Sequence, residues 1–96
     1  MEGRYNIVIN TPGRKERGTA VIIVQGGRIS GRASVKGYTT QFKDGKINGD
    51  EFEFSGEVKV LLKRIPYIVR GKVQGESLKG VIFSKYGTFD ITGYKY

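Results

Sequence analysis

Four carboxylates gather in one short segment of the chain, at Asp50, Glu51, Glu53 and Glu57. Two carboxylates that face each other could act as general acid and base, as in glycoside hydrolysis. The three glutamates, however, all stand at odd positions of the alternating segment EFEFSGEVKVLLK, so they share one face of a strand. Exposed carboxylates keep ordinary pKa values and make poor general acids. We interpret the cluster as a solvated strand surface.

The glycine-rich segments do not match a phosphate-binding loop. The stretch GRISGRAS, residues 27–34, lacks the Gly-Lys-Ser/Thr sequence of such a loop, and no helical pattern follows it. Histidine and cysteine are absent, which removes the commonest metal ligands, and no acidic loop has calcium-site spacing. We therefore expect no metal, no other cofactor, no catalytic residues and no enzymatic activity.

Length and charge are typical of one small basic domain. We assign residues 1–96 to a single domain, because the chain has 96 residues. No apolar run approaches the roughly 20 residues that a membrane-spanning helix needs, and the first residues lack the apolar region of a signal peptide. We expect a cytoplasmic protein. Its net charge of +8, from 17 basic and 9 acidic residues, favours anionic partners.

A turn pattern recurs three times, as VQGGRI, INGDEF and VQGESL. In each copy an apolar residue ends a strand, a polar residue and a glycine follow, and a second apolar residue comes three positions after that glycine. Glycine adopts the positive φ angles that tight hairpins require. The pattern predicts hairpin turns at Gly26–Gly27, Gly49–Asp50 and Gly75–Glu76.

Strand-like alternation fills the sequence between the turns, and no window shows a helical stripe. Seven short connections predict eight strands, and short connections favour antiparallel pairing of neighbours. Closure removes the exposed edges, so we expect an all-β fold, a single antiparallel eight-stranded up-and-down (meander) barrel. The KDG segment, residues 43–45, interrupts the alternation and predicts a bulge. We place the strands near residues 4–10, 18–25, 28–35, 38–48, 51–62, 66–73, 77–84 and 88–95.

The alternation also predicts which side chains face inward. The large aromatic members of this set are Tyr5, Phe42, Phe54, Tyr67 and Phe89. Inward glycines have two interpretations, room for a ligand or sharp coiling of the strands, and strand coiling is the commoner cause. A barrel of eight strands is either filled by side chains or holds one small ligand. The inward glycines are Gly31, Gly56, Gly71, Gly80 and Gly93.

The predicted meander resembles the calycin-type barrels, which include lipocalins and fatty-acid-binding proteins, and the avidin-like barrels. A Gly-x-x-[Ile/Leu]-x-Gly hairpin at Gly26–Gly31 and Gly75–Gly80 also looks like one in small uncharacterised bacterial β-barrel proteins. The resemblance implies the barrel shape and a general binding role. The chain lacks tryptophan, so neither the lipocalin Gly-x-Trp signature nor the tryptophans of avidin-like biotin sites can be assigned to it.

Basic residues gather at one predicted end of the barrel. The glycine turns share one end, which leaves the connections near residues 11–18, 35–38, 62–66 and 84–87 at the other. That end, the expected mouth, carries seven cations against Glu16 alone, or +6 of the total +8. A second interpretation is that loops collect lysine and arginine for solubility. The seven candidate ligand-binding residues are Arg14, Lys15, Arg17, Lys36, Lys63, Arg64 and Lys85.

Three roles follow from these patterns. We favour a binding protein that takes a small anionic or amphipathic ligand at the basic mouth. A nucleic-acid-binding barrel that uses the same rim is a less favoured alternative, because only three tyrosines lie near the mouth for base stacking. A structural or self-associating module is the third, since adjacent strands would expose one apolar patch. That patch contains Leu61, Ile68, Val81 and Phe83.

Overall fold

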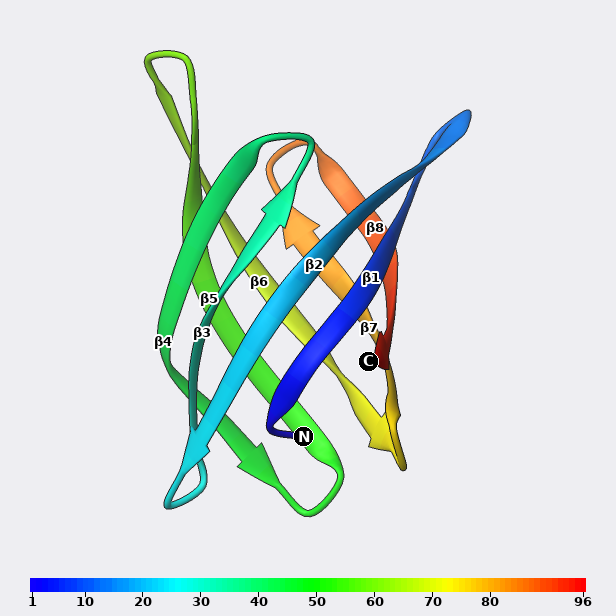
Figure 1. Ribbon diagram of the computed structural model, residues 1–96. Helices are drawn as coiled ribbons and strands as arrows, with labels where there is room; N and C mark the ends of the chain where they lie inside the picture. The colour runs from blue at the N-terminus through cyan, green and yellow to red at the C-terminus, as the bar shows by residue number, and fades with distance from the viewer.

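The computed structural model describes residues 1–96 as eight antiparallel strands without a helix (Figure 1). Accordingly, it holds no helix long and apolar enough to cross a lipid bilayer. The strands are β1 (Gly3–Thr11), β2 (Arg14–Gln25), β3 (Arg28–Val35), β4 (Tyr38–Asn48), β5 (Glu51–Val60), β6 (Lys63–Gln74), β7 (Ser77–Ser84) and β8 (Gly87–Lys95).

Each strand pairs with its sequence neighbours, and β1 also pairs with β8, so the sheet closes on itself. The predicted fold class, an up-and-down barrel of eight strands, is therefore confirmed. The strands cross the barrel at a steep tilt, and the β1–β2 and β5–β6 hairpins rise beyond its body (Figure 1). Closure leaves no unpaired sheet edge that could recruit another strand.

The three predicted glycine turns connect strands at one end, which we call the glycine-turn end. Gly26 and Gly27 have φ angles of 57° and 78°, the pattern of a type I′ turn. Gly49 and Gly75 have φ angles of 64° and 60° and each begins its two-residue turn. Positive φ is unstrained in glycine, which explains why the same short motif recurs.

The structure corrects two of the predicted connections. The segment expected as a loop over residues 11–18 is mostly strand, because Thr11 pairs with Arg14 across a tight Pro12–Gly13 turn. Likewise, β5 ends at Val60, and the turn is Leu61–Leu62 rather than residues 62–66. Both hairpins run beyond the barrel body (Figure 1). The charged segment RKERG shows no apolar alternation, so the sequence misses the start of β2, whereas the alternation of EFEFSGEVKVLLK continues past Val60 and predicts a β5 that is two residues too long.

The predicted bulge lies in β4. The register between β4 and β5 shifts between Phe42 and Lys46, and Asp44 has a φ angle of 61°. A bulge increases local twist and bends the strand. The bend lets β4 follow the curved wall of the barrel.

Buried side chains fill the barrel beside the glycine turns. Tyr5 and Ile29 are fully buried, and Phe52 and Leu78 are nearly so. The Tyr5 hydroxyl donates to the carbonyl oxygen of Met1 at 2.7 Å, which holds the start of the chain against this core. The glycine-turn end is thus closed by packed side chains.

Candidate functional site

The opposite end of the barrel contains a cavity of about 290 Å³. All eight strands contribute to its wall, and 19 of the 21 lining residues are hydrophobic. Tyr38 and Tyr86 line it and are 45% and 58% exposed, so the cavity reaches solvent at this end, the mouth. An apolar cavity of this kind stays dry and favours apolar occupants.

The five aromatic residues predicted to face inward all lie inside the barrel. Phe42, Phe54, Tyr67 and Phe89 line the cavity, and Phe42 stacks on Phe54 with ring centroids 4.2 Å apart. Tyr5 lies below the cavity, in the closed end. These rings form rigid walls, whereas small lining residues such as Ala20 and Ala33 leave space.

The inward glycines serve strand coiling rather than ligand space, since none of the five lines the cavity. Gly71 pairs with Gly80 across β6 and β7. A Cβ atom on Gly71 would lie 2.1 Å from the carbonyl oxygen of Lys79, well inside van der Waals contact. Glycine is required there because two backbones approach closely.

Two hydroxyl groups form a polar point in the otherwise apolar wall. Thr40 Oγ1 donates to the carbonyl oxygen of Glu57 at 2.8 Å, and it lies 2.8 Å from the hydroxyl of Tyr67. A threonine hydroxyl has one proton, so Tyr67 donates to Thr40. Burial raises the pKa of Tyr67, and the hydrogen bond with Thr40 partly opposes that rise. Tyr67 is therefore neutral at physiological pH and keeps a free acceptor lone pair.

Sequence reasoning placed Tyr67 inside but missed Thr40. A usable signal was present, because Thr40 stands between Tyr38 and Phe42 in a period-two pattern that faces inward. An inward threonine surrounded by aromatic residues requires a hydrogen-bond partner. Tyr67, on β6, supplies it across β5.

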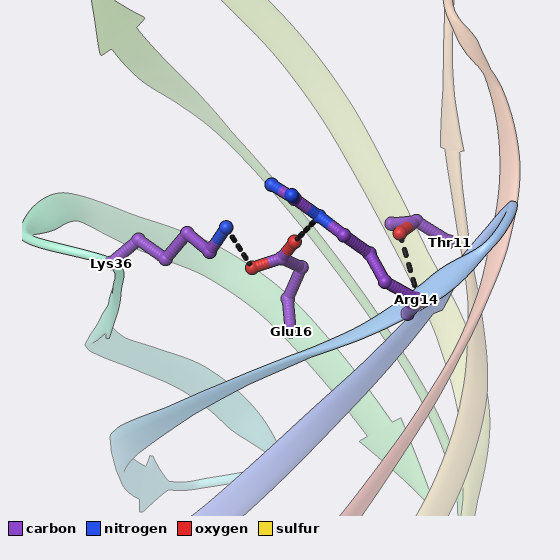
Figure 2. Close-up of polar contacts among 4 residues, drawn as sticks. All are labelled: Thr11, Arg14, Glu16 and Lys36. Atoms are coloured by element: carbon purple, nitrogen blue, oxygen red, sulfur yellow. Dashed lines mark hydrogen bonds and ion pairs between the residues drawn. The ribbon is translucent and has the colours of Figure 1, made fainter.

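An ion-pair cluster lies at the mouth (Figure 2). Glu16 Oε1 accepts a hydrogen bond from Arg14 Nε at 2.6 Å, and Glu16 Oε2 lies 3.0 Å from Lys36 Nζ. The two cations approach the carboxylate from opposite sides (Figure 2). Thr11 donates to the carbonyl oxygen of Arg14, which fixes the tip of the β1–β2 hairpin. This contact holds Arg14 at the mouth.

The position of Glu16 links the cluster to the cavity. Glu16 stands opposite Ile9 in the β1–β2 ladder, and Lys36 directly follows Val35 in the chain. Both apolar neighbours, Ile9 and Val35, line the cavity. The Glu16 side chain is only 12% exposed. Its pKa is lowered by Lys36 and by Arg14, against an opposing effect of desolvation. The cluster therefore consists of one ionised carboxylate and two cations, with a net charge of +1.

The other five predicted mouth cations do not join this cluster. Lys15 and Arg17 alternate with Glu16 on β2 and point outward, while Lys63 and Arg64 begin β6. Lys85 lies over the ring of Tyr86, with its Nζ 5.4 Å from the ring centroid. None of the five forms an ion pair, so each contributes uncompensated positive charge.

The four clustered carboxylates lie elsewhere, toward the glycine-turn end and along the outer face of β5. Glu53 pairs with Arg70, and Glu51 lies 3.9 Å from Lys72. Asp50 and Glu57 are exposed and unpaired. Two of the four carboxylates thus pair with a lysine or an arginine, and the other two face solvent.

The predicted apolar patch is only partly assembled. Ile68 pairs directly with Phe83, and Val81 lies two positions away on β7. Leu61 is not part of this patch, which corrects the sequence-based assignment. It lies in the β5–β6 turn, past the last ladder row, Val60–Lys63, which is itself five rows from Ile68, or roughly 17 Å at 3.3 Å per residue. The cause is the register of the hairpin, because β5 ends at Val60 instead of residue 62 and β6 begins at Lys63 instead of near residue 66.

The fold and the site together define a small closed barrel that encloses an apolar cavity. No family model and no curated protein sequence matches the chain. Among solved structures, a redesigned β-barrel, mFAP1, bound to DFHBI, is similar with a TM-score of 0.74 and 10% identity, over 99% of this chain and 94% of that chain.

Two further structures show the same architecture. A second redesigned β-barrel, b11L5F_LGL, has a TM-score of 0.74 and 10% identity, over 99% of this chain and 90% of that one. The REP1-NXSQ fatty acid transporter has a TM-score of 0.58 and 11% identity, over 99% and 95%. The TM-scores show a shared fold, and at identities this low they show the fold alone. That fold is the eight-stranded barrel that the resemblance to calycins implies.

Proposed function

We propose that this protein binds a small amphipathic molecule, with its apolar body in the cavity and an anionic head group at the mouth. The observation that carries the proposal is the apolar cavity of about 290 Å³, whose wall includes Ile9, the ladder partner of Glu16, and Val35, the residue before Lys36. Of the similar barrels, one is bound to DFHBI and another is a fatty acid transporter. These similarities support a role in binding.

The cavity volume limits the size of the ligand. A water molecule occupies about 30 Å³ in the liquid, so the space corresponds to on the order of ten non-hydrogen atoms. A medium-length alkyl chain or a single substituted ring fits this size. The Tyr67 hydroxyl is a hydrogen-bond acceptor in the cavity wall, and a ligand hydroxyl or amine could donate to it.

The head group would bind at the cations that Glu16 positions. Arg14 uses only its Nε in the hydrogen bond to Glu16, which leaves both terminal amino groups without a protein partner. A carboxylate can accept two parallel hydrogen bonds from such a guanidinium group. Lys36 is half-exposed on the other side of Glu16 and would complete the anionic subsite.

Calorimetric titration with octanoate, octanol and octylammonium tests both parts of the proposal. We expect octanoate to bind most tightly and octylammonium least tightly. Ala33→Phe fills the cavity and should abolish binding of all three probes. Equal affinity for the three head groups would contradict the anionic subsite, and undiminished binding by Ala33→Phe would contradict the cavity.

A matched pair of charge variants locates the head group. Arg14→Gln should weaken octanoate binding about threefold to tenfold and leave octanol unaffected. Arg28→Gln removes the same charge near the glycine-turn end and serves as the control. A single-stranded oligonucleotide completes the probe set. If the wild type binds the oligonucleotide, Arg14→Gln loses that binding and Ala33→Phe keeps it, the rim binds nucleic acid instead of a small ligand.

A further inference from the structure

The tip of the β5–β6 hairpin is unusually apolar. Leu61 and Leu62 are 85% and 96% exposed, more than any other large hydrophobic residue of the chain. The hairpin rises beyond the barrel body at the mouth end (Figure 1). The other turns at this end are Pro12–Gly13, Lys36–Gly37 and Lys85–Tyr86, and none presents an aliphatic pair.

Two features of this tip lower the folding stability of the hairpin. Leu61 has a φ angle of 57°, in the left-handed region where a leucine side chain is strained. Lys59 stands directly opposite Arg64 on the two strands, a like-charge pair that disfavours the ladder. Residues that break local rules without a folding benefit typically mark a functional site.

The chemistry around the leucines matches an anionic lipid surface. Lys59, Lys63 and Arg64 surround the tip, all three are exposed, and none has an acidic partner. Apolar side chains enter the boundary between lipid head groups and acyl chains, while basic residues attract anionic lipids. A protein partner would need acidic groups placed around a leucine pocket, whereas an anionic bilayer offers both features over its whole surface.

The hairpin also leads directly to the cavity. Val58 pairs with Ile65 two rows below the end of the ladder, and both line the cavity. Tyr38 and Tyr86 stand exposed at the same mouth, and tyrosine favours membrane interfaces. We propose that the barrel docks by its mouth on an anionic lipid surface, with Leu61 and Leu62 inserted and the basic residues on the head groups. The docking does not depend on the ligand proposed above.

Co-sedimentation with phosphatidylcholine vesicles, with and without phosphatidylserine, tests the docking. We expect the wild type to bind only the vesicles that contain phosphatidylserine. Leu61→Asn combined with Leu62→Ser should weaken binding at least tenfold, because the apolar insertion is lost. Lys63→Gln combined with Arg64→Gln should weaken it roughly 30-fold, as expected for two interfacial charges. The control, Lys46→Gln with Lys79→Gln, removes two charges away from the mouth and should have much less effect.

Tryptophan emission provides a second measurement of orientation, because the chain has no tryptophan of its own. Leu62→Trp should shift to shorter wavelength on the anionic vesicles, and Glu76→Trp, in a glycine turn, should not. Absence of wild-type binding, equal losses in tip and control variants, or equal emission shifts would overturn the proposal. A dimer without lipid that the leucine variant abolishes would also overturn it, because the tip would then bind a second copy.

Discussion

The hydroxyl groups of Thr40 and Tyr67 lie 2.8 Å apart in a cavity wall made otherwise almost entirely of hydrocarbon. Thr40 donates its single proton to the carbonyl oxygen of Glu57, so the hydrogen bonds run in one direction, from Tyr67 to Thr40 to the backbone. The two residues are therefore not equivalent. Thr40 has two partners in this chain of hydrogen bonds, and Tyr67 has one.

Substitution of these two residues should reveal the asymmetry. Thr40→Val keeps the shape but leaves the buried Tyr67 hydroxyl without an acceptor, at an expected loss of about 1–3 kcal/mol of unfolding free energy. Tyr67→Phe leaves the bond from Thr40 to Glu57 in place and should cost about 0.5–1.5 kcal/mol. Urea denaturation measures both. A larger loss for Tyr67→Phe than for Thr40→Val would contradict this asymmetry.

Glu16 should make stability depend on pH in the acid range. Lys36 and Arg14 lower its pKa in the folded protein, so its ionised form contributes stability that is fully present above the ordinary value of 4.5. That contribution is lost as the pH falls through the lower, folded-state pKa. Glu16→Gln should therefore unfold more easily than the wild type at neutral pH, with a difference that shrinks in acid.

Carboxyl chemical shifts measured by NMR check the cause. The Glu16 carboxyl should titrate below 4.5 in the wild type and closer to 4.5 in Lys36→Gln. Lys15→Gln, which removes a neighbouring charge that points outward, is the control and should shift the titration less. A wild-type midpoint at or above 4.5 would show that desolvation outweighs the two cations.

The strand order and the glycine turns could be predicted because their signals are local. Positive φ at Gly26 and Gly49 selects glycine directly, and alternation identifies each inward face. The ends of the β1–β2 and β5–β6 hairpins could not be predicted in this way. Arg14 and Lys63 belong to strands that have left the core, so no apolar alternation indicates them.

The cavity itself was beyond sequence reasoning. The cavity volume is the space inside the barrel minus the total volume of the inward side chains. Replacement of Ala33 by one larger residue would change that volume. The role of Glu16 was missed for a related reason. Its charged segment lacks apolar alternation and is typical of a loop, whereas strand pairing with Ile9 turns the Glu16 side chain toward the mouth.

Self-association through Ile68, Val81 and Phe83 stays a prediction. Ile68 and Phe83 are paired, and they remain 40% and 39% exposed on the outer face. Arg70 lies over the Phe83 ring, 5.8 Å from its centroid, and would border such an interface. We expect Phe83→Lys to abolish a concentration-dependent dimer in sedimentation velocity, and Leu61→Asn to leave it intact. Identical monomeric behaviour of wild type and Phe83→Lys would exclude this interface.

The strain at Leu61 leads to a stabilising substitution. Asparagine tolerates the left-handed region that Leu61 occupies at a φ angle of 57°, and a side chain that is 85% exposed loses little burial. Leu61→Asn should therefore raise the unfolding free energy by about 0.5–1 kcal/mol. Leu62→Asn makes the same chemical change at a position without positive φ and should be nearly neutral. Thermal and urea unfolding of the two variants measures the difference. Equal effects would show that the leucine backbone is unstrained, whereas a gain in stability confined to Leu61→Asn would show that the wild-type tip sacrifices stability to keep its leucine pair.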